Sequence, residues 1–188
     1  MMIALFDRWQ VRSFVLDDAE AIAKYANNRH VSINLRDSFP YPYTVNDAKR
    51  WLKHVRGQSP EVSWAIASDI EAIGGIGIHL QRDVYRRSAE LGYWLGEPFW
   101  GKGIATAAVR AVTAYAFNHF DIERLFAGVF EWNPASCRVL EKAGFRLESR
   151  MRKSIVKDDK VIDQFLYVML REEYQRAQSR STPSNNER

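Results

Sequence analysis

Cysteine is nearly absent from the chain, because Cys137 is the only one among 188 residues. A single cysteine excludes an internal disulfide and a metal site built from several cysteines, and it is typical of a reducing compartment. The sequence also lacks an apolar run of the roughly 20 residues that a membrane-spanning helix needs. Asp7 and Arg8 interrupt the apolar start, which does not fit a signal peptide. We therefore expect a cytoplasmic protein with no membrane partner.

Neither sign of charge is in large excess, since 27 Lys and Arg face 23 Asp and Glu and leave a net charge of +4. The basic residues are scattered, so we expect no nucleic-acid partner, although a smaller anionic ligand is compatible with the charge. The hydrophobic share of 46% and aromatic share of 13% indicate a globular protein. We expect one domain over 1–175 and a polar, flexible tail over 176–188.

Hydrophobic periodicity predicts helices and strands that alternate along the whole chain, without an internal repeat or linker. The expected elements are a strand through Val15, a helix after an acidic cap at Asp17 or Asp18, a helix from a cap at Thr44 or Asn46 to Val55, two strands split at 69–71, a strand over 89–95, a helix over 104–120, a strand over 124–130, a helix over 134–144 and two strands around the turn 157–160. This order predicts one α/β (α+β) domain with a mixed, largely antiparallel sheet.

A glycine-rich loop, "GEPFWGKGIAT" over 96–106, follows the apolar strand "GYWL" and precedes the longest predicted helix. It nearly matches the phosphate-binding pattern G-x-x-x-x-G-K-[ST], but Gly103 stands where magnesium requires Ser or Thr. Backbone N–H groups beside Gly101 and Gly103, together with the helix start, would attract an anion. The alternative interpretation is a tight turn between a strand and a core helix.

A second pattern, "NPASCRVLEKAGF" over 133–145, reads as a short capped helix. Asn133 is a natural N-cap, Pro134 fits the first helical position, Ser136 lies in the first turn and Gly144 ends the helix. Each residue has a purely structural explanation, in which Asn133 only caps and Ser136 only fills space. The combination of the two patterns, separated by one helix and one strand, is far more specific than either alone.

Together, "YWLGEPFWGKGIATAAV" and "NPASCRVLEKAGF" resemble the GNAT acetyltransferases, and within them the branch of the ribosomal-protein N-terminal acetyltransferases RimJ and RimL. The resemblance covers nearly the whole chain and implies a mostly antiparallel central sheet with splayed middle strands and helices on both faces. It further implies acetyl-CoA as cosubstrate, with no metal. One departure is Pro98, which stands where the family pattern has Gln or Arg and puts one peripheral phosphate contact in doubt.

The resemblance also implies where the cosubstrate binds. Backbone N–H groups from Gly101 to Thr106 would hold the pyrophosphate, the preceding strand would pair with the pantetheine arm, and Asn133 would hydrogen-bond the pantetheine or acetyl end. The residues so assigned are Tyr93, Trp94, Leu95, Trp100, Gly101, Lys102, Gly103, Ile104, Ala105, Thr106 and Asn133. A backbone N–H near Tyr93 or Trp94 is the expected stabiliser of the oxyanion that forms in direct acyl transfer.

Two side chains are the catalytic candidates. Ser136 would donate a proton to the departing thiolate, and Glu90 would act as general base on the amine, directly or through a water. The alternative for Glu90 is a strand-end carboxylate paired with Arg86 or Arg87. Tyr167 and His79 are protic groups for which we favour packing, as we do for Cys137, which lacks His and Asp partners in the sequence.

The stretch "NLRDSFPYPY" is expected to edge the acceptor pocket. Its polar and aromatic residues, which would contact the acceptor, are Asn34, Arg36, Phe39, Tyr41 and Tyr43. An inward Arg36 would favour an acidic acceptor, whereas a pocket of carboxylates would favour polyamines or aminoglycosides.

The sequence thus favours an acetyl-CoA-dependent N-acetyltransferase that acts directly on a primary amine, above all the α-amine of a protein or peptide N terminus. The alternatives are an acetyltransferase of a small amine, such as a polyamine, an aminoglycoside or an amino-acid derivative, and a non-catalytic acyl-CoA-binding module. The expected assembly is a monomer or a homodimer.

Overall fold

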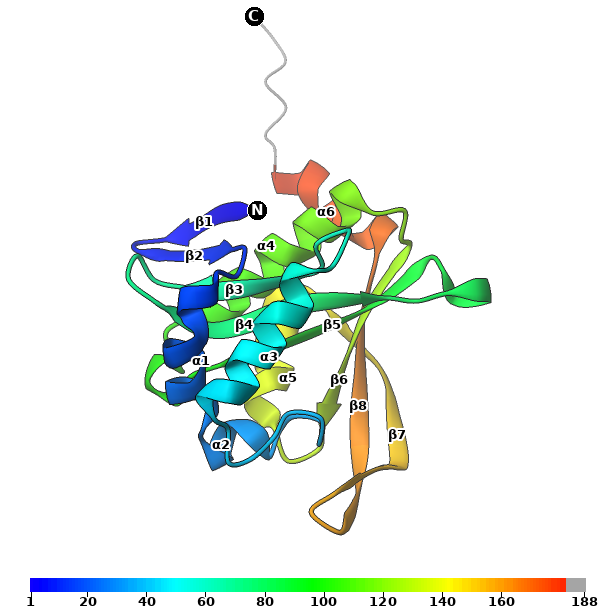
Figure 1. Cartoon of the computed structure of the whole chain (residues 1–188). Coiled ribbons are helices and arrows are strands. Elements are labelled where there is room, and N and C mark those ends of the chain that lie inside the picture. Colours follow the sequence, from blue (N-terminus) through cyan, green and yellow to red (C-terminus); the bar gives the residue numbers. More distant parts are fainter. Residues whose placement is uncertain (182–188) are drawn as a thin grey trace, which may run out of the picture.

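Eight strands form one sheet in the order β1-β2-β3-β4-β5-β6-β8-β7, with helices on both faces (Figure 1). The computed structural model describes residues 1–181. Its strands are β1 (Met2–Phe6), β2 (Trp9–Arg12), β3 (Ser63–Ala67), β4 (Ala72–Leu80), β5 (Ser88–Leu95), β6 (Arg124–Phe130), β7 (Arg146–Lys157) and β8 (Lys160–Leu170). Its α-helices are α1 (Ala19–Ala26), α2 (Arg29–Ser32), α3 (Val45–Arg56), α4 (Ile104–His119), α5 (Pro134–Ala143) and α6 (Arg171–Ser181). The mixed, mostly antiparallel sheet expected from the sequence is confirmed.

Each face of the sheet has its own hydrophobic core. The helix α4 is buried along Ile104, Ala108, Val109, Val112 and Ala116, and packs with α5 on one face. The helices α1 and α3 cover the opposite face of the same strands, as Figure 1 shows. Because successive residues of a strand point to opposite faces, each central strand contributes side chains to both cores. The sequence spacing predicts one apolar stripe over Ala105, Ala108, Val109, Val112, Ala116 and Phe120. The middle four are buried, and Ala105 and Phe120 are half-buried against the same core.

The N-terminal region differs from its prediction, because a hairpin of β1 and β2 replaces the single strand expected through Val15. The second strand ends at Arg12, and the Val15 N–H donates to the Asp18 carboxylate at 2.9 Å instead of continuing the ladder. Asp18 also accepts two hydrogen bonds from Arg12, so its side chain does not cap α1. The predicted cap at Thr44 is confirmed, since its hydroxyl accepts from the Asp47 N–H.

The chain end is helical as far as the structure describes it. Residues 176–181 of the expected tail belong to helix α6, which starts directly after β8. Arg171 fixes that start by donating to the carbonyl oxygens of Phe117, Phe120 and Ile122. The remainder of the expected tail, 182–188, lies outside the described residues. Within residues 1–181, no helix is long and apolar enough to cross a membrane.

The middle of the sheet contains a parallel pair, β5 with β6, that is only three residue pairs long. Ser88, Ala89 and Glu90 pair with residues 124–126, and beyond Glu90 the two strands diverge. The rest of β5 remains paired with β4 on its other side, while β6 remains paired with β8 through Phe130. Residues 91–95 therefore present one edge that no strand of the described chain covers.

The close approach of β4 to β5 depends on glycine. A Cβ added at Gly74 would meet the Leu95 Cα at 3.0 Å, and the Trp94 carbonyl oxygen would lie closer still. Backbone atoms of a paired strand cannot move aside without breaking the ladder. At Gly92, on the facing strand, an added Cβ would meet no atom within 4 Å.

We expect Gly74→Ala to lower the free energy of unfolding by about 1–3 kcal/mol, the usual cost of overpacking. Gly92→Ala is the matched control and should change it by less than about 0.5 kcal/mol. Urea unfolding followed by circular dichroism measures both values. Equal stability of the two variants would contradict the proposed steric role of Gly74.

Candidate functional site

The glycine loop ends in the uncapped start of α4. Gly101 and Gly103 have φ angles of 75° and 78°, a region that glycine adopts without steric cost. A Cβ at either position would meet no atom within 4 Å, so open space lies beside the backbone. Within the described chain no side chain caps α4, and the N–H groups of its first turn are available to a ligand. This geometry fits an anion such as a phosphate.

Aromatic and polar side chains hold the loop in place. Trp100 donates its indole N–H to the carbonyl oxygen of Leu95 at 2.7 Å, which ties the loop back to the end of β5. Glu97 accepts from Asn28 at 2.5 Å and lies 2.9 Å from His30 Nδ1, and these hydrogen bonds lower the pKa of Glu97. Lys102 lies over the ring of Phe99, 5.7 Å from its centroid. These contacts hold the part of the loop that precedes Gly103.

The open edge of β5 presents backbone groups from alternate residues. The Gly96 N–H donates to the Ile73 carbonyl at 2.8 Å, so even-numbered residues of β5 direct their backbone toward β4. The backbone groups of Leu91, Tyr93 and Leu95 consequently face the gap between β5 and β6. The Tyr93 N–H, rather than the Trp94 N–H, is the group placed for a ligand in this gap.

The structure brings Ser136 and Tyr93 together. Asn133 caps α5 by accepting from the Ser136 N–H at 3.1 Å, as the sequence predicts. The Ser136 hydroxyl then lies 2.7 Å from the Tyr93 hydroxyl. Burial raises the pKa of Tyr93, and the hydrogen bond with Ser136 opposes that shift only in part, so the phenol stays protonated at neutral pH. A half-buried pair of hydroxyls therefore adjoins the gap.

Glu90 is paired, but with neither of the arginines considered from the sequence. Its two carboxylate oxygens lie 2.5 and 2.7 Å from Arg36 Nη2. Arg87 pairs instead with Asp121 and Glu123. The alternative pairing with Arg86 or Arg87 is therefore wrong: Arg86 donates to the Asp83 carbonyl, and Glu90 points to the face covered by α1 and α3. Ser136 lies on the opposite face.

Apart from Arg36, the residues expected to bind the acceptor do not contact Glu90. Phe39 packs against Tyr43 and Trp94, at centroid distances of 4.8 and 5.7 Å, within the second core. Tyr43 is only 6% exposed. Asn34 donates to the His30 carbonyl at 2.8 Å, and the half-exposed Tyr41 lies against Arg29. Of the five residues, only Arg36 lines the pocket described next.

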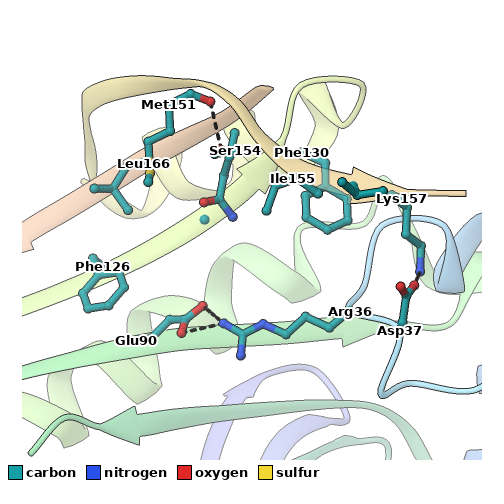
Figure 2. Close-up of a pocket in the computed structure, with 13 residues that line it drawn as sticks. Arg36, Asp37, Glu90, Phe126, Phe130, Met151, Ser154, Ile155, Lys157 and Leu166 are labelled. Carbon is teal, nitrogen blue, oxygen red and sulfur yellow. Dashed lines mark hydrogen bonds and ion pairs between the residues drawn. The ribbon is translucent and has the colours of Figure 1, made fainter. Parts of the chain in front are cut away.

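A pocket of about 500 Å³ opens beside Glu90, on the part of the sheet that no helix covers. Figure 2 shows Arg36 reaching across its lower side to Glu90, and Lys157 meeting Asp37 at one end. Its lining residues are Arg36, Asp37, Glu90, Phe126, Gly128, Phe130, Met151, Ser154, Ile155, Val156, Lys157, Gln164 and Leu166.

The sequence interpretation assigned none of the β6–β8 lining residues to a site. A signal was nonetheless present in "RLFAGVF", where Phe126 and Phe130 lie on the strand face opposite to Leu125, Ala127 and Val129, and α4 and α5 can cover only one of these two apolar faces. Tyr167, on the covered face, is buried and donates to Glu141 at 2.8 Å, whereas His79 is exposed beside Glu90 in the strand register.

Comparisons with known proteins agree with this geometry. The family profile described as "Acetyltransferase (GNAT) domain" matches residues 8–146. The uncharacterized N-acetyltransferase p20 of Bacillus licheniformis is 28% identical over 174 residues, which cover 89% of this chain and 96% of p20. The uncharacterized N-acetyltransferase YoaA of Bacillus subtilis (strain 168) is 30% identical over 172 residues, which cover 88% of this chain and 94% of YoaA.

Among solved structures, the fold is similar to that of RimL, a ribosomal L7/L12 alpha-N-protein acetyltransferase in complex with coenzyme A. The TM-score is 0.79 at 19% sequence identity, and the alignment covers 90% of this chain and 98% of RimL. At this identity the likeness shows the fold alone.

The buried Tyr43 gives a pH-dependent prediction. Burial, with a smaller contribution from the charge of Asp47, raises the pKa of its hydroxyl from 10.0 to about 12. A raised pKa in the folded state stabilises the fold fully below pH 10, and this contribution is lost as the pH rises through 12. When the pH is raised from 10 to about 12, the free energy of unfolding of Tyr43→Phe should therefore fall less than that of the unmodified protein.

Urea unfolding at a series of pH values from 8 to about 12 tests this prediction. A pKa that differs between the folded and unfolded states changes the slope of the free energy of unfolding against pH. Tyr41→Phe, at a half-exposed position, is the control and should keep the parental slope. An unchanged slope in Tyr43→Phe would show that Tyr43 does not titrate with the fold.

Proposed function

The chain belongs to the GNAT family of acetyltransferases and is an N-acetyltransferase, and from this premise we propose that it acetylates the α-amine of a protein or peptide N terminus, using acetyl-CoA. The observation that carries this choice of acceptor is the charge balance of the pocket beside Glu90. Its two carboxylates, Glu90 and Asp37, are each paired with a cation, Arg36 and Lys157. The pocket is otherwise uncharged.

A paired and mostly apolar pocket disfavours the small polycationic amines. Polyamines and aminoglycosides carry several positive charges, and a site that selects them needs carboxylates in excess. A peptide N terminus carries a single amine, whose pKa of about 8 lets it become neutral more readily than a lysine with a pKa near 10.4. A pocket with one carboxylate at the reacting end suits such an amine.

On the α4 face of the sheet, opposite to the pocket beside Glu90, the glycine loop supports coenzyme A as the ligand. We assign the pyrophosphate to the backbone from Gly101 to Thr106, because two left-handed glycines, open space and the uncapped start of α4 coincide there. Two phosphates without a reactive γ-phosphate need N–H groups rather than magnesium, so Gly103 is compatible with this ligand. Bound acetyl-CoA would supply the acetyl group that is transferred.

The open edge of β5 would orient the arm of that ligand. Backbone groups of Leu91, Tyr93 and Leu95 face the gap, and an extended chain can add to such an edge as a further strand. The Leu95 carbonyl already accepts from Trp100, which leaves Leu91 and Tyr93 for the arm. The Tyr93 N–H would then hydrogen-bond the acyl oxygen as negative charge develops on it.

Ser136, positioned by Tyr93, would supply the proton that the departing thiolate needs. The Ser136 hydroxyl is held by the 2.7 Å contact with Tyr93, and its helix is fixed by the Asn133 cap. Because Tyr93 remains protonated, its hydroxyl can donate a hydrogen bond to the Ser136 oxygen while Ser136 gives its proton to the thiolate, and Ser136 would then recover a proton from water. Ser136 is thus our candidate acid, and the Tyr93 hydroxyl positions it.

Glu90 would accept the proton of the amine, but only after its contact with Arg36 has changed. A single Arg36 nitrogen contacts both carboxylate oxygens. Arg36 is 68% exposed, so its side chain can move toward solvent at small cost. An incoming ammonium would replace the guanidinium as the partner of Glu90, which couples acceptor binding to exposure of the base.

Two substitutions test the hydroxyl pair. Ser136→Ala should lower kcat by about 10²-fold or more, as loss of a general acid implies. Tyr93→Phe keeps the ring and its packing but removes the partner of Ser136, so it should lower kcat by a smaller factor and leave KM for acetyl-CoA nearly unchanged. Thiol release with saturating acetyl-CoA measures both. An unchanged kcat in Ser136→Ala across the pH range would exclude it as the acid.

A parallel acceptor panel tests the proposed function. Thiol release is measured with N-terminal peptides, spermidine and an aminoglycoside, and mass spectrometry locates the acetyl group on each product. We expect peptides to be acetylated at the α-amine with the highest kcat/KM, and Glu90→Gln to lower that value by about 10²-fold or more. Turnover confined to spermidine or the aminoglycoside would show that the peptide assignment is wrong.

A further inference from the structure

We propose that the pocket beside Glu90 selects peptide acceptors whose first residue has a bulky apolar side chain, such as Leu, Met or Phe. This inference rests on the proposed function, because it assigns the pocket to the residue that carries the reacting α-amine. It adds a substrate preference that follows from the walls of the pocket on β6, β7 and β8.

The walls are apolar on three strands. Phe126 and Phe130 come from β6, Met151 and Ile155 from β7, and Leu166 from β8. Figure 2 shows these side chains ranged around the space above the Arg36–Glu90 pair. The volume of about 500 Å³ lies in the range of pockets that enclose small organic ligands. An apolar side chain of a substrate would be removed from water there, which favours binding.

The charged residues of the pocket are satisfied by one another. Two consecutive residues of opposite charge make these pairs: Arg36 pairs with Glu90 on β5, and Asp37 pairs with Lys157 on β7. The Lys157 side chain is only 5% exposed, and its ammonium group lies 2.7 Å from Asp37. When the amine displaces Arg36 from Glu90, the exposed guanidinium would move to solvent and not into the pocket. A charged first side chain would therefore find no spare counter-ion inside the pocket, and burying an unpaired charge is costly.

The floor of the pocket offers an uncharged polar group. A Cβ at Gly128 would meet the Gln164 Cδ at 2.8 Å, so the absence of a side chain lets the Gln164 amide lie across β6. Ser154 already donates to the Met151 carbonyl at 2.9 Å. The Gln164 amide is therefore suited to a peptide carbonyl or N–H of the acceptor, beside the apolar walls.

A bulge in β7 fixes the outer wall. The register between β7 and β8 shifts between Met151 and Ile155, and Lys153 has a φ of 53°. Asp163 holds this bulge by accepting from the Lys153 N–H at 2.8 Å and from Arg150 Nε at 2.5 Å. These hydrogen bonds lower the pKa of Asp163, so the carboxylate stays ionised and the bulge stays fixed at neutral pH.

The position of the Glu90 carboxylate sets the orientation in which an acceptor peptide would bind. Glu90 is at one side of the pocket and next to the point where β5 and β6 separate. Gly92, two residues further on the same face of β5, is exposed and leaves open space beside the gap. An α-amine near Glu90 would thus lie at the gap, while its own side chain reaches the walls of β6 to β8.

A peptide series tests the preference. Pentapeptides that differ only in their first residue, Leu, Met, Phe, Gly, Ser, Asp or Lys, are compared by kcat/KM with the unmodified enzyme. We expect Leu, Met and Phe to exceed Gly by about 10- to 100-fold, as burial of one apolar side chain implies, and Asp and Lys to fall at or below Gly. The Leu peptide without its α-amine should inhibit competitively and better than the corresponding Asp peptide.

Variants locate the preference in the pocket. Leu166→Gln and Met151→Gln should each lower the ratio of Leu to Ser peptide turnover by about 3-fold or more. Leu147→Gln is the matched control, because Leu147 is also an exposed apolar residue of β7 but does not line the pocket. Circular dichroism checks that each variant folds. If Leu166→Gln does not fold, Met151→Gln still tests the pocket, because Met151 is 41% exposed and its site accommodates a polar side chain.

The outcomes separate this inference from the proposed function. Acetylation of all peptides within about 3-fold, or a preference that survives both pocket variants, overturns the inference and leaves the proposed function standing. Failure of every peptide, with turnover of other amines, overturns the proposed function and the inference together. A Leu-to-Ser ratio that falls in the pocket variants and not in Leu147→Gln supports both.

Discussion

The short parallel contact between β5 and β6 is the constraint on which the rest of the site depends. Three residue pairs hold the strands together, and their separation beyond Glu90 leaves an edge that the backbone of Leu91 and Tyr93 must present to a ligand. Because side chains alternate along β5, Glu90 and the Tyr93–Ser136 pair lie on opposite faces of the sheet beside this separation. A longer ladder would satisfy these backbone groups internally.

Two electrostatic arrangements use this gap differently. On the α4 face, the uncapped helix start and two left-handed glycines provide N–H donors without a balancing acid, which suits an anionic ligand. On the opposite face, Arg36 and Asp37 cancel the charges of Glu90 and Lys157, which suits a neutral or singly charged acceptor. The uncapped helix start and the charge-balanced pocket thus lie on opposite faces of the sheet.

Local patterns predicted the structure best where each residue acts on its own segment. The Thr44 and Asn133 caps, the apolar stripe of α4 and the turn at Asp158 and Asp159 follow from hydrogen bonds or backbone angles within a few residues. The N-terminal hairpin was missed because its apolar residues resemble one longer strand, and β2 ends where Asp18, six residues from Arg12, captures the Val15 N–H.

The sequence by itself determined the family, the order of most elements and the glycine loop before α4, because these depend on composition and short spacings. The tertiary structure alone decided the partner of Glu90, the contact between Tyr93 and Ser136, and the walls of the pocket. Arg36 and Glu90 are 54 residues apart in sequence, and Tyr93 and Ser136 are 43 apart. Such contacts depend on strand register and on which face each side chain occupies, and a shift of one residue would reverse both.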